Sequence, residues 1–263
     1  MKLHRIAAII WRHIYLYQRS LPRWLEIFYW PLLDLLLWGF ISLYLSRFSG
    51  SVPKFVGFFL GALIFWDILY RANQGVSISF LEDVWSRNLL NLFASPLTAG
   101  EFLAALMTMG IIKMLTGTIA AVIMARILYS FNIFTLGLAF IPFVLNLLLM
   151  GWAIGIVTTA VILRFGMGAE VLAWGLALIF QPISAVFYPV STLPPSLQTL
   201  AFFTPSAHVF EGMRQVLSAG AFPWHDLIWA FGLNAVYLSI AVLFFFQILR
   251  QVRRLGLLMR VEQ

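Results

Sequence analysis

The sequence predicts an all-α, polytopic membrane protein, and three observations carry that prediction. Hydrophobic residues make up 62% of the chain and charged residues only 10%, which would give a soluble domain far more apolar surface than such domains tolerate. Six stretches are long and apolar enough to cross a bilayer, whose hydrocarbon core of about 30 Å needs ~20 helical residues. The basic residues between these stretches fall almost entirely on one side.

The six expected transmembrane helices cover residues 27–46, 55–76, 103–127, 134–163, 170–187 and 226–249. The fourth contains Pro142, which has no backbone N–H and is expected to bend the helix near its outer end. The fifth is short and runs into Tyr188-Pro189, so we expect it to end before the far surface. Residues 1–263 therefore form one transmembrane domain, whose six-span bundle covers 27–249 and is followed by a basic tail, 250–263.

The distribution of Lys and Arg predicts the orientation, because cytoplasmic loops are enriched in them. One side collects Lys2, Arg5, Arg12, Arg19, Arg23, Arg87, Arg164, Arg250, Arg253, Arg254 and Arg260, and the other only Arg47, Lys54 and Arg214. Both termini are thus expected in the cytoplasm, with the chain in the cytoplasmic (inner) membrane. The net charge of +7 then reflects attraction to lipid headgroups, and a nucleic-acid partner is not expected. With no cysteine, the chain has no disulfide framework or thiol chemistry.

Residues 1–23 are too polar to span a membrane but are patterned as an amphipathic helix. Apolar residues recur at helical spacing, while Arg5, Arg12 and Arg19 stand seven apart on another face. We expect this helix to lie in the inner interface with its arginines at lipid phosphates. It is either a simple anchor or a helix that also touches a cytoplasmic partner.

The loop between the second and third spans is expected to contain a short helix. Ser79 and Glu82 have the spacing of a capping box, so the helix should begin there, and Ser95-Pro96 should end it. Thr98 and Glu101 have the same spacing and should begin the third span. The segment is either a solvated surface helix or a lever mounted stiffly between two membrane helices.

The outer loop from Tyr188 to Trp224 is apolar and divided by prolines. We expect one short helix capped by Ser196 and a second from Ser206 to Ser218, both dipping back into the outer leaflet. Glu211 and Arg214 stand three apart on the second helix. They form either an ordinary surface ion pair or part of an outer gate.

Ionisable residues inside the spans are costly there and are therefore functional candidates: Asp34, Asp67, Arg71 and Lys113. Asp67 and Arg71 are four apart on one helical face, and Asp34 lies at a depth similar to that of Arg71. We interpret the four as a structural ion-pair network; a proton or substrate relay is the alternative.

No catalytic or metal-binding signature accompanies these residues. The four histidines lie outside the expected spans without metal-ligand spacing, and the chain has no Gly-Lys dipeptide for a phosphate-binding loop. We therefore expect no catalytic site, metal or bound cofactor in this chain, and any ATP must be used by another subunit.

Two local sequences, in this order and topology, resemble the permease subunits of type-2 ABC exporters, the ABC-2 family. The first is Leu92-Phe93-Ala94-Ser95-Pro96-Leu97-Thr98 followed by Glu101. The second is Phe187-Tyr188-Pro189-Val190 with Leu193-Pro194, then Pro205 and Glu211-Gly212-Met213-Arg214. The resemblance covers nearly the whole chain, from the N-terminal helix to the last span.

The resemblance implies a half-transporter that dimerises and recruits two copies of a separate ATPase subunit, which binds ATP and Mg. The short cytoplasmic helix would be a coupling helix, and the turn from Arg164 to Gly168 a smaller second contact. The implied ATPase contacts are Glu82, Asp83, Trp85, Arg87, Asn88, Leu89 and Arg164. Near the implied translocation path the aromatic candidates are Phe58, Phe59, Phe65, Trp66, Phe180, Phe187 and Tyr188, although many phenylalanines must simply face lipid.

The expected function is ATP-driven export of an amphipathic or hydrophobic substrate, either a drug, a peptide, a lipid or a lipid-linked glycan. The Phe187-Tyr188-Pro189 pattern looks slightly more like the multidrug branch. An ion-coupled secondary transporter using the buried charges is the alternative, and an internal inverted repeat, which would favour it, is not found. An intramembrane enzyme is a third reading, but the buried ionisable residues match no catalytic set.

Overall fold

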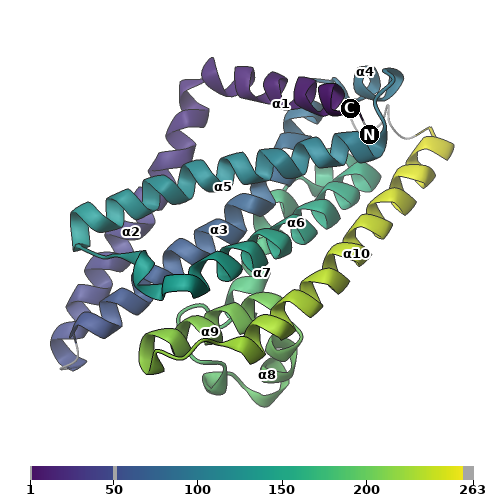
Figure 1. Ribbon diagram of the computed structural model, residues 1–263. Helices are drawn as coiled ribbons and strands as arrows, with labels where there is room; N and C mark the ends of the chain where they lie inside the picture. Colours follow the sequence, from purple (N-terminus) through teal and green to yellow (C-terminus); the bar gives the residue numbers. More distant parts are fainter. Residues whose placement is uncertain (1, 50–51, 257–263) are drawn as a thin grey trace.

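A computed structural model describes residues 2–49 and 52–256, and every element within them is helical (Figure 1). This confirms the all-α class. Arg260 lies outside the described residues, and the side chains of Arg47 and Lys54 are also outside the description.

The elements, in chain order, are α1 Leu3–Gln18, α2 Leu21–Ser49, α3 Val52–Trp85, α4 Leu89–Ala94, α5 Ala99–Tyr129, η1 Ile133–Ala139, α6 Phe140–Phe165, η2 Gly166–Ala169, α7 Leu172–Ile183, η3 Val190–Thr192, α8 Pro195–Phe202, α9 Pro205–Ala219 and α10 Trp224–Arg254. The η elements are short 3-10 helices.

Three of the described helical stretches are long and apolar enough to cross a membrane: α5, the stretch Ile133–Ala169 and α10. Shorter apolar stretches lie at Phe28–Tyr44 within α2 and at Leu172–Ile183. The 12 residues of α7 extend only ~18 Å, less than the ~30 Å of a hydrocarbon core. The chain is therefore a membrane protein by helix length and composition, and the six-span topology remains a prediction.

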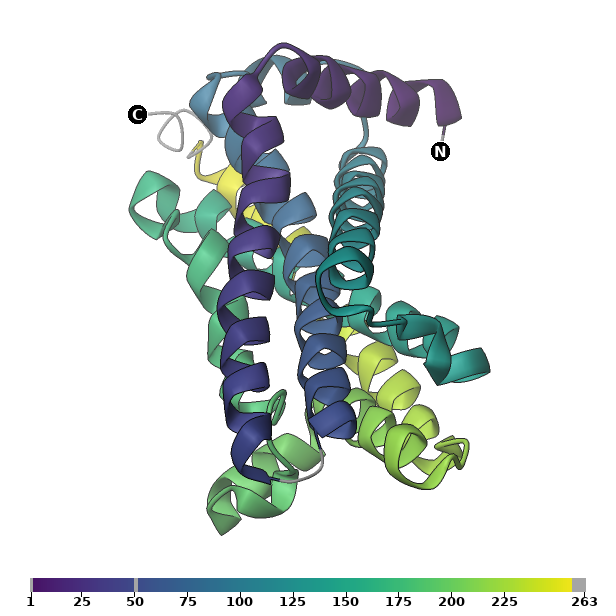
Figure 2. The same cartoon turned by 90° about the vertical axis from the view of Figure 1, so that its left-hand side faces the viewer.

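Helix α3 lies at the centre of the bundle, packed against α2, α5, α6 and α7 (Figure 2). Gly75 of α3 meets Gly110 of α5 so closely that a Cβ on Gly75 would collide with the Gly110 backbone. Small residues allow such an approach where apolar burial contributes little to helix association. Between α6 and α10, the buried Asn234 amide donates to the Asn146 backbone and side-chain oxygens at 3.0 and 2.9 Å.

The bundle has two distinct ends. Helix α1 lies across one end, where α4 and the last turns of α10 also lie, and we call this the α1 end (Figure 1). Helices α8 and α9 lie at the opposite end. The basic segments at residues 2–23, 87 and 250–254 therefore gather at one end of the molecule, as the charge pattern predicted.

The expected helix start at Ser79 is wrong, because α3 continues without interruption to Trp85 and Ser79 is buried in it. The chain turns only at Arg87, whose φ is 51°, and the short helix is α4 alone. The same residue spacing can occur inside a helix, where the backbone N–H groups are already hydrogen-bonded and need no cap. The spacing alone therefore cannot distinguish a helix start from a helix interior. The second box is confirmed, with Thr98 and Glu101 capping each other at the start of α5.

The expected bend at Pro142 is also wrong. Pro142 lies in the first turn of α6, where a missing N–H costs nothing. The break occurs earlier, at Gly137, whose φ and ψ are 57° and −135°. The two helices expected between Tyr188 and Trp224 are confirmed as helices, although Pro194, not Ser196, precedes the first, and Gly220 ends the second with a φ of 66°. Their place in the outer leaflet stays a prediction.

Candidate functional site

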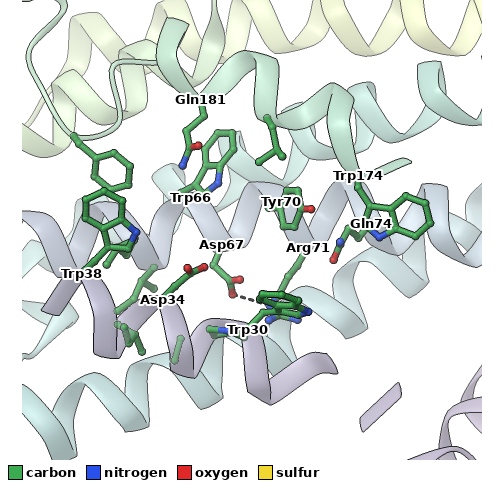
Figure 3. Close-up of a pocket in the computed structure, with 17 residues that line it drawn as sticks. Trp30, Asp34, Trp38, Trp66, Asp67, Tyr70, Arg71, Gln74, Trp174 and Gln181 are labelled. Atoms are coloured by element: carbon green, nitrogen blue, oxygen red, sulfur yellow. Dashed lines mark hydrogen bonds and ion pairs between the residues drawn. The ribbon is translucent and has the colours of Figure 1, made fainter. Parts of the chain in front are cut away.

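A cavity of about 690 Å³ opens between α2, α3 and α7 (Figure 3). Its polar lining consists of Asp34, Asp67, Arg71, Gln74 and Gln181. Its aromatic lining consists of Trp30, Trp38, Trp66, Tyr70, Trp174 and Phe187. The mixture of large aromatic walls and a few polar groups is typical of small-molecule sites, which span roughly 300–1,000 Å³.

Helix α3 supplies one wall of the cavity because its residues recur at helical spacing. Asp67, Arg71 and Gln74 are separated by four and three positions and so share one face. Arg71 Nε donates to Asp67 Oδ2 at 2.7 Å, which confirms the expected pair. The Arg71 guanidinium packs on Gly117 of α5, where a Cβ would collide with it.

Asp34 enters the cavity from α2. Figure 3 shows its carboxylate next to that of Asp67, and the charges of Asp67 and Arg71 both act on it. Within the described residues, Asp34 has neither a hydrogen bond nor an ion pair. The cavity therefore contains one paired carboxylate and one carboxylate that has no partner in the described part of the chain.

Aromatic rings continue the cavity wall toward the α8 end. Phe187 stacks between Trp38 at 5.2 Å and Phe59 at 5.6 Å, measured between ring centroids. Phe58 contacts Phe59 edge-on at 5.9 Å, and the Arg214 guanidinium lies 5.1 Å from the Phe58 ring. This row of rings extends from the cavity to Arg214 of α9.

The aromatic candidates from the sequence divide into three groups. Trp66 and Phe187 line the cavity, and Phe58 and Phe59 extend its wall. Phe65 is fully buried on another side of α3, against Phe140 and Phe143. Phe180 packs on the core, and the Tyr188 hydroxyl donates to the Pro182 carbonyl at 2.9 Å.

Sequence reasoning missed much of the cavity lining, namely Trp30, Trp38, Tyr70, Gln74, Trp174 and Gln181. For Tyr70 and Gln74 a signal existed, because they share the α3 face of the charged pair. For the residues on α2 and α7 none did, because which faces of three helices meet depends on tertiary packing.

Lys113 does not line the cavity. Its Nζ lies 4.7 Å from the Tyr17 ring centroid of α1, and its charge acts on Glu82. The structure thus brings together Asp34, Asp67 and Arg71 and places Lys113 nearer the α1 end.

A second ionic cluster joins α1 to the end of α3. His13 is fully buried, with Nδ1 3.2 Å from Glu82 Oε2 and Nε2 3.6 Å from Asp83 Oδ2. Arg12 donates to Asp83, and Arg23 Nε lies 3.8 Å from Glu82 Oε1.

The His13 imidazole and the Glu82 carboxylate both have altered pKa values in this cluster. Burial opposes the charged form of His13, but hydrogen bonds and attraction to Asp83 and Glu82 outweigh it and raise its pKa above 6.5. Burial opposes the charged form of Glu82 too. The His13 hydrogen bond and the charges of Lys113, His13 and Arg23 nevertheless lower its pKa to about 2.

This cluster changes the expectation for the arginines of α1. Arg5 Nη1 lies 3.5 Å from Glu101 Oε2, and the Lys2 backbone N–H donates to Glu101 Oε1 at 2.7 Å. Arg5 and Arg12 therefore bind carboxylates of the protein. Arg19 is exposed, and its contact with lipid phosphates stays a prediction.

The residues implied as ATPase contacts differ in accessibility. Glu82, Asp83 and Leu89 are buried and face the protein, so they offer no surface to another subunit. Trp85 and Arg87 are exposed, Asn88 is half-buried, and Arg164 lies in the last turn of α6 near the Phe165 ring. Trp85 Nε1 also donates to Glu170 Oε2 at 3.3 Å.

Glu211 and Arg214 form the expected pair at 3.2 Å and also bind the backbone of the segment after α7. Glu211 Oε1 accepts from the Val190 backbone N–H at 2.6 Å, and Arg214 donates to the Ala185 and Tyr188 carbonyls. The pair thus ties α9 to the segment that follows α7.

Within the described residues, no three His, Cys, Asp or Glu side chains are grouped to hold a metal ion. The chain matches no protein-family model, and no curated protein is similar enough in sequence to be detected.

Proposed function

We propose that this chain is the permease subunit of an ATP-driven exporter of the ABC-2 type, in which six helices span the cytoplasmic membrane with both termini inside. It would work as a homodimer, or with a closely related permease, together with two copies of an ATPase subunit that binds ATP and Mg. The cargo would be an amphipathic or hydrophobic molecule such as a drug, a lipid or a lipid-linked glycan.

The observation that carries this proposal is the continuity of α3. One uninterrupted helix bears Asp67, Arg71 and Gln74 in the cavity and ends at Trp85, next to the exposed turn that leads into α4. A displacement of α4 would be transmitted along a rigid rod to the cavity wall, as a population shift between two dimer states requires.

The proposal is tested by native mass spectrometry of the tagged chain, gently extracted from its own membrane. We expect a complex of two permeases with two ATP-binding subunits. A monomer or homodimer alone, under conditions that preserve a known ABC complex, would contradict the proposal.

A surface variant tests the coupling role of the turn before α4. Arg87→Asn removes an exposed charge with a side chain that tolerates the φ of 51° there. Substrate-stimulated ATPase activity of the complex should fall while the melting temperature stays unchanged. The control is Arg126→Asn, at an exposed position of α5 remote from α4, which should leave the ATPase unchanged.

An ion-coupled carrier is the second candidate, and Asp34 favours it, because a proton-coupled carrier needs an acid without a fixed partner. This function would give uptake or efflux in ATP-depleted vesicles that responds to an imposed proton gradient. Transport that requires ATP and ignores the gradient would exclude it.

A further inference from the structure

We infer that the cavity between α2, α3 and α7 binds an amphipathic organic cation, with Asp34 as its counter-ion and the surrounding tryptophans as its walls. As a statement about cargo this inference rests on the proposed function. As a statement about binding it concerns the chain alone.

The first argument is charge. Among the described residues that line the cavity, the two carboxylates Asp34 and Asp67 face one guanidinium, Arg71, which is paired with Asp67 at 2.7 Å, so one negative charge is in excess. In the membrane span proposed for α2 this excess charge is costly, and a bound cation would compensate it. The nearby Asp67 carboxylate adds to the attraction.

The second argument is the shape and chemistry of the walls. Trp30 is 59% exposed and lines the same cavity as Asp34, together with Trp66 of α3 and Trp174 of α7. In Figure 3 Trp174 lies next to Gln74, farther from Asp34 than Asp67 is. Tryptophan gives the strongest cation–π attraction of the aromatic side chains, and cages of such rings recognise ammonium groups. The aromatic row through Phe187 and Phe59 offers further apolar surface to the rest of an amphipathic molecule.

A neutral glycan would also stack on these rings and hydrogen-bond to Gln74 and Gln181. It would leave the charge of Asp34 uncompensated, and for this reason the cation is the better occupant.

The test is equilibrium dialysis of the purified chain in detergent without any ATPase, with empty micelles as the blank. Tetraphenylphosphonium is the cationic probe, and triphenylphosphine oxide is a neutral molecule that shares three of its phenyl rings. The variants are Asp34→Asn, Trp30→Leu and, outside the cavity, Asp226→Asn as a control. A neutral oligosaccharide, maltohexaose, is measured in parallel.

We expect the wild-type chain to bind the cation more tightly than the neutral probe. Asp34→Asn should weaken cation binding by roughly tenfold or more, the loss that follows removal of a partner from a charged contact. Trp30→Leu, at an exposed site, should weaken it several-fold. Asp226→Asn, which alters a contact with His208 outside the cavity lining, should bind as the wild type does. Cation binding unchanged in Asp34→Asn and Trp30→Leu would overturn the inference, as would tighter binding of maltohexaose than of the cation. No ATPase is present, so this result and the test of the exporter complex fail independently.

Discussion

His13 Nδ1 lies 3.2 Å from Glu82 Oε2 in a fully buried contact that fastens α1 to the last turns of α3. The N-terminal helix is therefore attached to the same rod that lines the cavity. An anchor that only rested on lipid would not need a buried imidazole between two carboxylates.

Thermal stability should depend on pH through this contact. Because the folded pKa of His13 is raised above 6.5, its stabilisation is complete below pH 6.5 and is lost as the pH rises through the folded value. Because the pKa of Glu82 is lowered from 4.5 to about 2, its stabilisation is present above pH 4.5 and is lost as the pH falls toward 2. Melting curves in detergent should therefore show a maximum between pH 4.5 and 6.5.

His13→Gln should remove the decline on the alkaline side of that maximum. His4→Gln, at an exposed position of the same helix, is the control and should keep it. An alkaline decline of equal size in both variants would show that another group causes it.

Removal of Arg71 should destabilise the fold more than removal of the whole Asp67–Arg71 pair. Arg71→Met leaves two neighbouring carboxylates without a cation and should cost roughly 3–5 kcal/mol. The double variant Asp67→Asn/Arg71→Met should cost less than Arg71→Met alone, because it also removes the negative charge of Asp67. A double-mutant cycle in unfolding free energy measures the difference, and additive effects would refute the coupling.

A methyl group at Gly75 should separate α3 from α5. Its Cβ would collide with the Gly110 backbone, so Gly75→Ala should destabilise the bundle by about 1–3 kcal/mol. Gly100, in the first turn of α5, has open space at its Cβ, so Gly100→Ala should be neutral or slightly stabilising. Melting temperatures of the two variants should move apart, and equal shifts would argue against the close crossing.

Arg214→Lys should loosen the segment after α7 while the fold persists. A single ammonium group cannot replace a guanidinium that pairs with Glu211 and also donates to the Ala185 and Tyr188 carbonyls. Amide hydrogen exchange should accelerate in residues 185–193. Arg126→Lys, which alters an exposed contact with the Ser130 carbonyl, should leave exchange there unchanged.

Local contacts were predictable from sequence wherever both partners lie within one helical turn. The Asp67–Arg71 and Glu211–Arg214 pairs, the cap of Thr98 by Glu101 and the end of α9 at Gly220 all belong to this class. The same local rule failed at Ser79, because α3, which packs against α5 and α6, continues through the capping pattern to Trp85.

The sequence by itself determined the all-α class, the membrane character and the gathering of basic segments at one end, since these follow from composition, helical periodicity and the order of charges along the chain. Only the tertiary structure decided that Asp34 shares a cavity with Asp67 and Arg71 and that tryptophans from three helices line this cavity. It also placed Lys113 outside the cavity, next to Tyr17 of α1. It also decided that Arg12 and His13 face Asp83 and Glu82. The physical reason is that such contacts join residues far apart in the chain. Which side chains face each other depends on the rotation of each helix about its axis. Close packing such as that of Gly75 on Gly110 sets this rotation.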